Sequence, residues 1–139
     1  MNIQKLELRI DWKDQDLLGH VNNLAVIGYF QSARIAICES IGFAPVVGMH
    51  YGPIEAATEV QFRKQLHYPG NITVLTGVEK IGNTSFILNH RIVDSSGDVA
   101  AFGKEVIVCF DFHKQCKIPV PESVRQQLYK YLLSEGCKN

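Results

Sequence analysis

Hydrophobic and polar residues alternate along most of the second half of this chain, as they do in the strands of an antiparallel sheet. The alternation predicts four strands, separated by segments rich in glycine, proline, asparagine and serine. They run from about Ile54 to Leu66, from Ile72 to Ile81, from Phe86 to Ile92 and from Val99 to Phe112. In the last strand Phe102 and Val106 lie on one face, which we expect to be the core face. A less regular alternation predicts a further strand from Ile3 to Trp12.

The segment from Leu24 to Ile41 has the longest helical pattern in the chain. Asn22 or Asn23 can cap its start, and Gly42 is a typical helix-ending residue. Apolar side chains occupy most of the circumference of this helix, which is the pattern of a buried helix. We therefore expect a curved sheet to wrap around it.

A shorter amphipathic helix is predicted from Glu122 to Leu133. The order of elements is strand, long helix, four strands and helix, without internal repeats or a linker. We expect a single domain over residues 1–139 and the α+β class. A curved, five-stranded antiparallel sheet around one central helix is the hotdog architecture, although several α+β folds share an antiparallel meander with one helix.

The composition excludes several classes of function. Hydrophobic residues make up 46% and charged residues 20% of the chain, and 14 basic residues balance 14 acidic ones. This balance argues against nucleic acid or a membrane surface as a partner, and it permits self-association. No segment approaches the roughly 20 apolar residues of a membrane-spanning helix.

The cysteines indicate a reducing compartment, because they form no paired or metal-binding motif. They are Cys38, Cys109, Cys116 and Cys137. The N-terminus lacks the apolar core of a signal peptide. We expect a cytoplasmic protein without a bound metal and without a catalytic cysteine.

Chemistry-bearing residues are concentrated directly before the long helix, in the run from Asp14 to Asn23. Free N–H groups at a helix start carry partial positive charge and can hold a carbonyl oxygen on which negative charge develops. A nearby carboxylate such as Asp16 can act as a nucleophile or as a base for water. Taken alone, the same residues also fit simple helix capping.

This run closely resembles the 4-hydroxybenzoyl-CoA thioesterase-like branch of the hotdog superfamily. Residues 14–23 read D-x-D-x-x-G-H-V-N-N, and Y-F-Q-S-A-R follows at residues 29–34. The resemblance continues over nearly the whole chain, in the strand at residues 60–62, the hairpin at 78–85, the segment 108–111 and the P-x-P-E at 119–122.

The resemblance implies that Asp16, and not Asp14, is the catalytic acid. It places the oxyanion-binding N–H on Asn23, with His20 and Asn22 at the mouth of the pocket. Gly19 would let the backbone approach the acyl group closely. Asp14 is expected to order the loop.

The resemblance also implies where the substrate binds. The helix residues Val26 and Tyr29 are expected to contact the substrate, and Val26, which replaces an aromatic residue common in the family, is expected to affect the shape of the acyl pocket. The hairpin is expected near the nucleotide of coenzyme A, and its candidate residues are Lys80, Gly82, Asn83, Thr84 and Ser85. Arg63, Lys64 and Lys104 are further candidates. Gln31 replaces a common glutamate, and Glu39 is the only acid on the helix, so Asp16 is favoured over a helix-borne acid.

The sequence thus favours hydrolysis of an acyl-CoA to a free acid and CoA. No cofactor is expected beyond the CoA that the substrate carries. A homodimer, or a tetramer of two dimers, is the expected assembly. Two alternatives stay open: a catalytically silent module that binds acyl-CoA, and a hydratase acting on enoyl-CoA.

Overall fold

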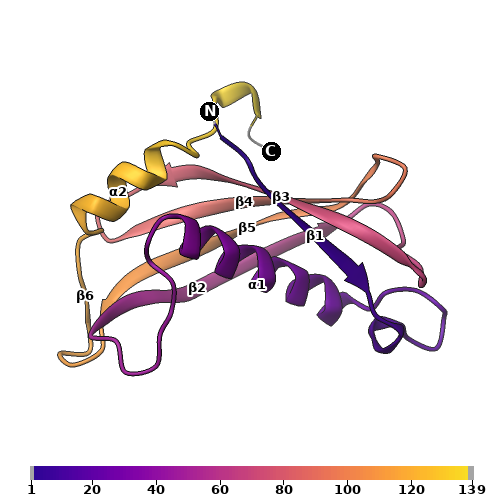
Figure 1. Cartoon of the computed structure of the whole chain (residues 1–139), viewed down its shortest axis with the longest axis horizontal. Coiled ribbons are helices and arrows are strands. Elements are labelled where there is room, and N and C mark those ends of the chain that lie inside the picture. The colour runs from indigo at the N-terminus through magenta and orange to yellow at the C-terminus, as the bar shows by residue number, and fades with distance from the viewer. Residues whose placement is uncertain (1, 138–139) are drawn as a thin grey trace.

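Six antiparallel strands form one sheet, and a long helix lies across it (Figure 1). The computed structural model describes residues 2–137. The strands are β1 (Gln4–Ile10), β2 (Tyr51–Phe62), β3 (Gly70–Ile81), β4 (Ser85–Val93), β5 (Val99–Asp111) and β6 (Cys116–Lys117). The helices are α1 (Asn23–Ser40) and α2 (Glu122–Tyr129), and two short 3-10 turns are η1 (Trp12–Asp14) and η2 (Glu135–Cys137). Neither helix in this part of the chain is long and apolar enough to cross a membrane.

The strands follow the order β1-β3-β4-β5-β2, so β1 and β2 form the two edges of the main sheet. The five predicted strands and the α+β class are confirmed. The sixth strand, β6, was not predicted, because two residues are too few to show alternation. It pairs with the end of β5.

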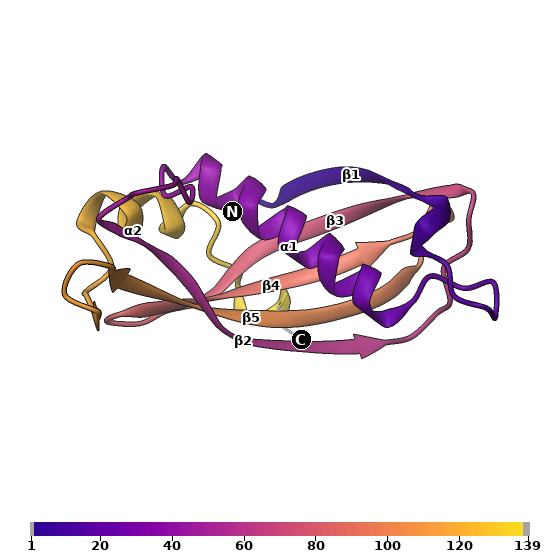
Figure 2. The ribbon, with the colours of Figure 1, turned by 90° about the horizontal axis from the view of Figure 1, so that it is seen from below.

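Helix α1 packs against one face of the sheet, between β1 and β2 (Figure 2). Its buried residues are Val26, Tyr29, Phe30, Ala33, Ile37 and Cys38. The expectation that the helix is covered on several sides is only partly met, because Leu24 and Ile27 are 73% and 39% exposed. The sheet of one chain covers only one side of an apolar helix.

The buried face of β5 differs from the one that the sequence suggested. The larger side chains of Phe102 and Val106 were expected in the core, yet both are only partly buried, whereas their neighbours Ala101 and Ile107 are buried. The core face contains small residues because α1 lies close to it. A Cβ atom on Gly103 would collide with the Glu59 carbonyl group and lie 2.9 Å from the Phe30 ring.

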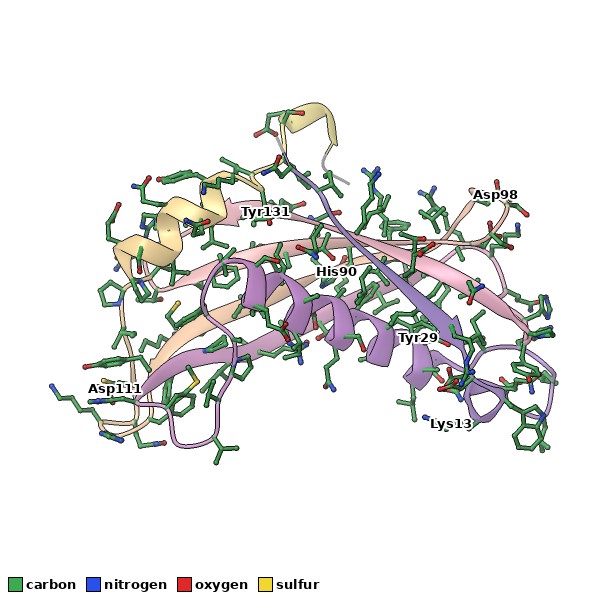
Figure 3. All side chains as sticks on the ribbon, in the orientation of Figure 1. Lys13, Tyr29, His90, Asp98, Asp111 and Tyr131 are labelled. Carbon is green, nitrogen blue, oxygen red and sulfur yellow. The ribbon has the colours of Figure 1, made fainter. Side chains whose placement is uncertain are left out.

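The interior consists of two apolar clusters separated by a polar layer. One cluster surrounds Phe30 in the first half of α1, and the other includes Ile37, later in α1, together with α2. The polar layer contains one residue from each of four elements. These are Thr76 on β3, His90 on β4, Glu105 on β5 and Arg34 on α1. Figure 3 places His90 of β4 in the middle of the molecule, and its ring centroid lies 4.7 Å from that of Phe30 on α1.

The C-terminal segment completes the sheet where β1 stops. Helix α2 ends at Tyr129 rather than at the predicted Leu133, because the chain turns to pair with β3. The Leu133 N–H donates to the Val78 carbonyl at 2.8 Å. A Cβ on Gly77 would lie 2.6 Å from the Leu133 side chain, so this glycine makes room for the segment.

Candidate active site

The Asp16 loop is a tight hairpin between η1 and α1. Gln15 and Val21 pair as an antiparallel bridge, and the Asp16 N–H donates to the His20 carbonyl at 2.9 Å. The Gly19 N–H donates to the Asp16 carbonyl at 3.1 Å. Gly19 has a φ of +78°, which a residue with a Cβ adopts only with strain. The loop therefore has a defined backbone and a specific need for glycine.

The carboxylate of Asp16 is held by one oxygen and open at the other. Oδ1 accepts from the Leu18 N–H at 2.8 Å and from the His20 N–H at 3.4 Å. No donor among the described residues contacts Oδ2, and the side chain is exposed. Such a carboxylate has a fixed orientation and keeps one oxygen free for water or for a substrate.

Asp14 is hydrogen-bonded to two neighbouring segments, and it also lines the cavity on the β1 side of α1. Its Oδ2 accepts from the Tyr29 hydroxyl at 2.8 Å and from the Asp11 N–H at 3.0 Å. Burial and the hydrogen bond to Asp14 raise the pKa of Tyr29, so its hydroxyl stays protonated. Tyr29 was expected to contact substrate; its hydroxyl ties the loop to α1, and the residue also lines a cavity beside the helix.

The start of α1 presents unpaired N–H groups beside this loop. Asn22 is the N-cap, and its Oδ1 accepts from the Ala25 N–H at 2.8 Å. The N–H groups of Asn23 and Leu24 find no acceptor in the part of the chain that the structure describes. They carry the positive end of the helix dipole. A carbonyl oxygen could therefore be stabilised there.

A second segment, after β2, borders the loop. The Leu66 carbonyl accepts from the Val21 N–H at 2.8 Å. His67 places its Nδ1 3.3 Å from the Gly19 carbonyl oxygen, and its ring meets that of His20 edge-on with 5.1 Å between centroids. His67 was not predicted, because nothing in the sequence relates it to a glycine 48 positions away.

Two cavities flank the start of α1. The first, of about 230 Å³, is mainly apolar and is lined by Val21, Val26, Phe62, Arg63, Lys64, Gln65, Leu66, Ala100 and Ala101. The second, of about 490 Å³, is more polar and lies toward β1; Asn22 and Tyr29 are among its lining residues. Val26 thus borders an apolar space that suits an acyl group. Asp16 lines neither cavity.

The hairpin expected to bind the nucleotide lies at the opposite end of the sheet. It comprises Lys80, Gly82, Asn83, Thr84 and Ser85, and it adjoins α2, since the Gly82 carbonyl accepts from Arg125 at 2.8 Å. The start of α1 packs at the other end of β4, nine residues and about 30 Å away. Figure 3 shows this separation, with Lys13 and Tyr29 at one end and Asp111 at the other. One chain does not bring Asp16 and the hairpin together.

The other candidate cations differ in whether an acidic side chain already pairs with them. Lys64 pairs with Asp94 and Asp98, and Lys104 pairs with Glu79. Arg63 lies over the Phe102 ring, 4.6 Å from its centroid, and has no acidic partner among the described residues. Of these candidate cations, Arg63 is therefore the one best placed to bind a phosphate or carboxylate at the apolar cavity.

The polar layer of the core contains charges that the sequence did not indicate. Glu105 is fully buried and contacts Arg34 at 2.6 Å and His90 at 2.8 Å. Arg34 also contacts Glu55 on the edge strand at 2.8 Å. Burial alone would raise the pKa of Glu105, but hydrogen bonds from His90 and Glu55 and the charge of Arg34 outweigh it and lower the pKa to about 2.

The cysteines offer no nucleophile in the described core. Burial raises the pKa of Cys38 to about 12 and that of Cys109 to about 11, so both stay protonated at neutral pH. Residues 2–137 contain no group of three or more histidine, cysteine or acidic side chains that could hold a metal ion.

The sequence profile of the thioesterase-like superfamily matches residues 10–128. Among solved structures, a predicted thioesterase from Bacillus stearothermophilus is 28% identical, with a TM-score of 0.87 over 97% of this chain and 100% of that one. A hypothetical protein from Staphylococcus aureus, solved in complex with CoA, is 14% identical, with a TM-score of 0.88 over 96% of this chain and 87% of that one.

A third similar structure is the 1,4-dihydroxy-2-naphthoyl-CoA thioesterase from Synechocystis. It is 14% identical, with a TM-score of 0.82 over 92% of this chain and 96% of that chain. A search of curated proteins finds no match. The likenesses of low identity establish the fold, and the profile match over most of the chain establishes the family. The chain belongs to the thioesterase-like superfamily and has the hotdog fold.

Proposed function

We propose that this protein is an acyl-CoA thioesterase in which Asp16 is the catalytic carboxylate. The observation that supports this most is the position of Asp16 in sequence and space. Its carboxylate has a fixed Oδ1 and an open Oδ2, and its loop leads directly into the unpaired N–H groups of Asn23 and Leu24. An anionic group and an oxyanion site are the two parts that thioester hydrolysis needs.

In the proposed reaction the thioester carbonyl oxygen accepts from the Asn23 N–H. Either Asp16 takes a proton from the water that attacks, or it attacks the carbonyl carbon directly and forms an anhydride, which water then hydrolyses to the free acid and the Asp16 carboxylate. The C–O bond forms, negative charge develops on the oxygen at the helix start, and the C–S bond then breaks. The thiolate leaves without a strong acid, because a thiol has a pKa of about 8.5. The acyl group occupies the apolar cavity beside Val26.

The proposed unit is a dimer joined through β2. This strand forms a 12-residue edge of the sheet and carries exposed aromatic residues at both ends, Tyr51 and Phe62. Antiparallel pairing of two β2 strands would place the Phe62 end of one chain beside the Tyr51 end of the other, covering both.

This pairing would also bring the hairpin to the catalytic loop. In the partner, β5 and β4 follow β2, so its hairpin would lie three strand spacings, about 14 Å, from the Phe62 end of the first chain. The nucleotide of CoA would then bind residues such as Lys80 of one chain while the thioester lies at Asp16 of the other. A CoA complex of a structurally similar protein supports a CoA ester as the ligand.

A purely structural Asp16 is the competing interpretation, since its Oδ1 already accepts two N–H groups of its own loop. The protein would then bind acyl-CoA without hydrolysing it. Release of free thiol from a panel of aliphatic and aromatic acyl-CoAs separates the two functions. Asp16→Asn should reduce kcat by at least about 100-fold. Glu39→Gln is the matched control, since it removes the acid at the far end of α1. Absence of thiol release from every acyl-CoA in wild type would contradict the proposal.

A further inference from the structure

His67 contacts the catalytic loop at a peptide group that Asp16 also contacts. Its Nδ1 lies 3.3 Å from the Gly19 carbonyl oxygen. A carbonyl oxygen only accepts, so Nδ1 carries the hydrogen, and the neutral ring then has an unprotonated Nε2. The donor remains when the imidazole is protonated, because both ring nitrogens then carry hydrogen.

The Gly19 carbonyl and the His20 N–H belong to one planar peptide group. Within this plane the His20 N–H points in the direction opposite to the carbonyl, and it donates to Asp16 Oδ1 at 3.4 Å. A peptide group rotates as a rigid unit, so holding its carbonyl also fixes the direction of its N–H. The hydrogen-bonded path runs from His67 through this peptide to the carboxylate of Asp16.

Among the described residues the Gly19–His20 peptide makes no backbone–backbone hydrogen bond of its own, whereas the Gly19 N–H and the His20 carbonyl on either side of it both bond to Asp16. Gly19 has a φ of +78°, and nothing lies within 4 Å of the position that a Cβ would occupy. A glycine in open space can rotate at low cost. The neighbouring contact, from the Val21 N–H to the Leu66 carbonyl at 2.8 Å, anchors the end of the loop but not this peptide.

We propose that His67 is a positioning residue that orients Asp16 through the Gly19–His20 peptide. This inference rests on the function proposed above, because it assigns His67 to the catalytic machinery of the same site. His67 itself needs no contact with the substrate. Its edge-on ring contact with His20 further restricts the loop.

Three variants distinguish the contribution of the Nδ1–H donor of His67 from that of its aromatic ring. His67→Asn keeps an N–H donor at the position of Nδ1, His67→Gln moves the donor one atom further out, and His67→Phe keeps a ring without a donor. We expect kcat for thiol release to fall about 10- to 100-fold in His67→Gln and His67→Phe, with KM unchanged. His67→Asn should stay within a few-fold of wild type. Thermal unfolding confirms that each variant folds.

Amide NMR tests the path independently of activity. The His20 amide resonance should shift, and its hydrogen exchange accelerate by about tenfold or more, in His67→Phe and His67→Gln but not in His67→Asn. Equal kcat and equal His20 exchange in all three variants would overturn the proposal. If wild type hydrolyses no acyl-CoA but the NMR pattern holds, the catalytic function is refuted and the loop contact stands.

Discussion

Arg34 on α1 and Glu105 on β5 form an ion pair of 2.6 Å in which the carboxylate is fully buried. The same carboxylate contacts His90 at 2.8 Å. A buried carboxylate is stable only with such partners, and removing one of them costs several kcal/mol. The pair therefore ties α1, which follows the Asp16 loop, to the centre of the sheet.

Because of this ion pair, we expect the free energy of unfolding to depend on pH in the acidic range. The folded-state pKa of Glu105 is about 2, below its ordinary 4.5, so its stabilising effect is complete above pH 4.5 and is lost as the pH falls toward 2. The difference corresponds to about 3 kcal/mol. Burial and the contact with Glu105 raise the pKa of Glu55, and this shift offsets part of the loss of stability in acid. Urea unfolding between pH 6 and pH 2 measures the net loss.

Glu105→Gln should lower the free energy of unfolding at pH 7 by about 3 kcal/mol and flatten its decline in acid. Glu7→Gln, an exposed change on β1, is the control and should retain the wild-type pH dependence. An unchanged acid decline in Glu105→Gln would show that other carboxylates cause it.

The proposed oxyanion site is the backbone N–H of Asn23 and not its side chain. Asn23→Ala keeps this N–H, so its kcat should stay near that of wild type. Asn23→Pro removes it, and kcat should fall about 100- to 1,000-fold. Proline is well tolerated at the first position of a helix, and the preceding Asn22 is extended, with φ −78° and ψ 162°.

The melting temperature of Asn23→Pro should therefore stay close to that of wild type, which separates lost catalysis from lost structure. Thiol release and circular dichroism measure the two quantities. Retained activity in Asn23→Pro would place the oxyanion elsewhere.

Gly19 and Gly97 form a matched pair of left-handed glycines. Both have positive φ, +78° and +87°, and both have open space where a Cβ atom would lie. Gly19→Ala and Gly97→Ala should each cost about 1 kcal/mol of stability from strain. Only Gly19→Ala should also lower kcat, because only Gly19 lies in the Asp16 loop. Equal kcat in the two variants would show that the loop geometry is not needed for catalysis.

Mixing two inactive variants tests whether the site spans two chains. Asp16→Asn has an intact hairpin, and a chain with Lys80→Ala and Ser85→Ala has an intact Asp16. In a mixed dimer one of the two sites combines both intact parts, so random mixing should restore about a quarter of wild-type activity. No restoration after verified exchange of subunits would mean that CoA binds within one chain.

Alternation and helical spacing predicted the main elements, because each strand and helix has an apolar pattern of its own. These patterns did not identify the buried face of a strand when both of its faces carry apolar residues. On β5, Phe102 and Val106 are larger and more hydrophobic than Ala101 and Gly103. The smaller residues nevertheless face the core, because α1 packs too closely against this face for larger side chains.

The candidate site was only partly predictable for a related reason. The loop from Asp14 to Asn23 is contiguous, so its chemistry could be recognised in sequence. The contact of His67 with Gly19 depends on how the segment after β2 folds back. Glu105 gave no signal, because a single acid in an alternating strand usually faces solvent. The distance between the hairpin and Asp16 follows from topology, which alternation does not specify.

The polar layer across the core divides the molecule into two halves. Phe30 belongs to the half next to the Asp16 loop, and Ile37 to the half that includes α2. Apolar packing is interrupted between them, so we expect the two halves to differ in their free energies of local opening. Under the proposed function, an acyl group that enters beside the Asp16 loop would then disturb one half more than the other.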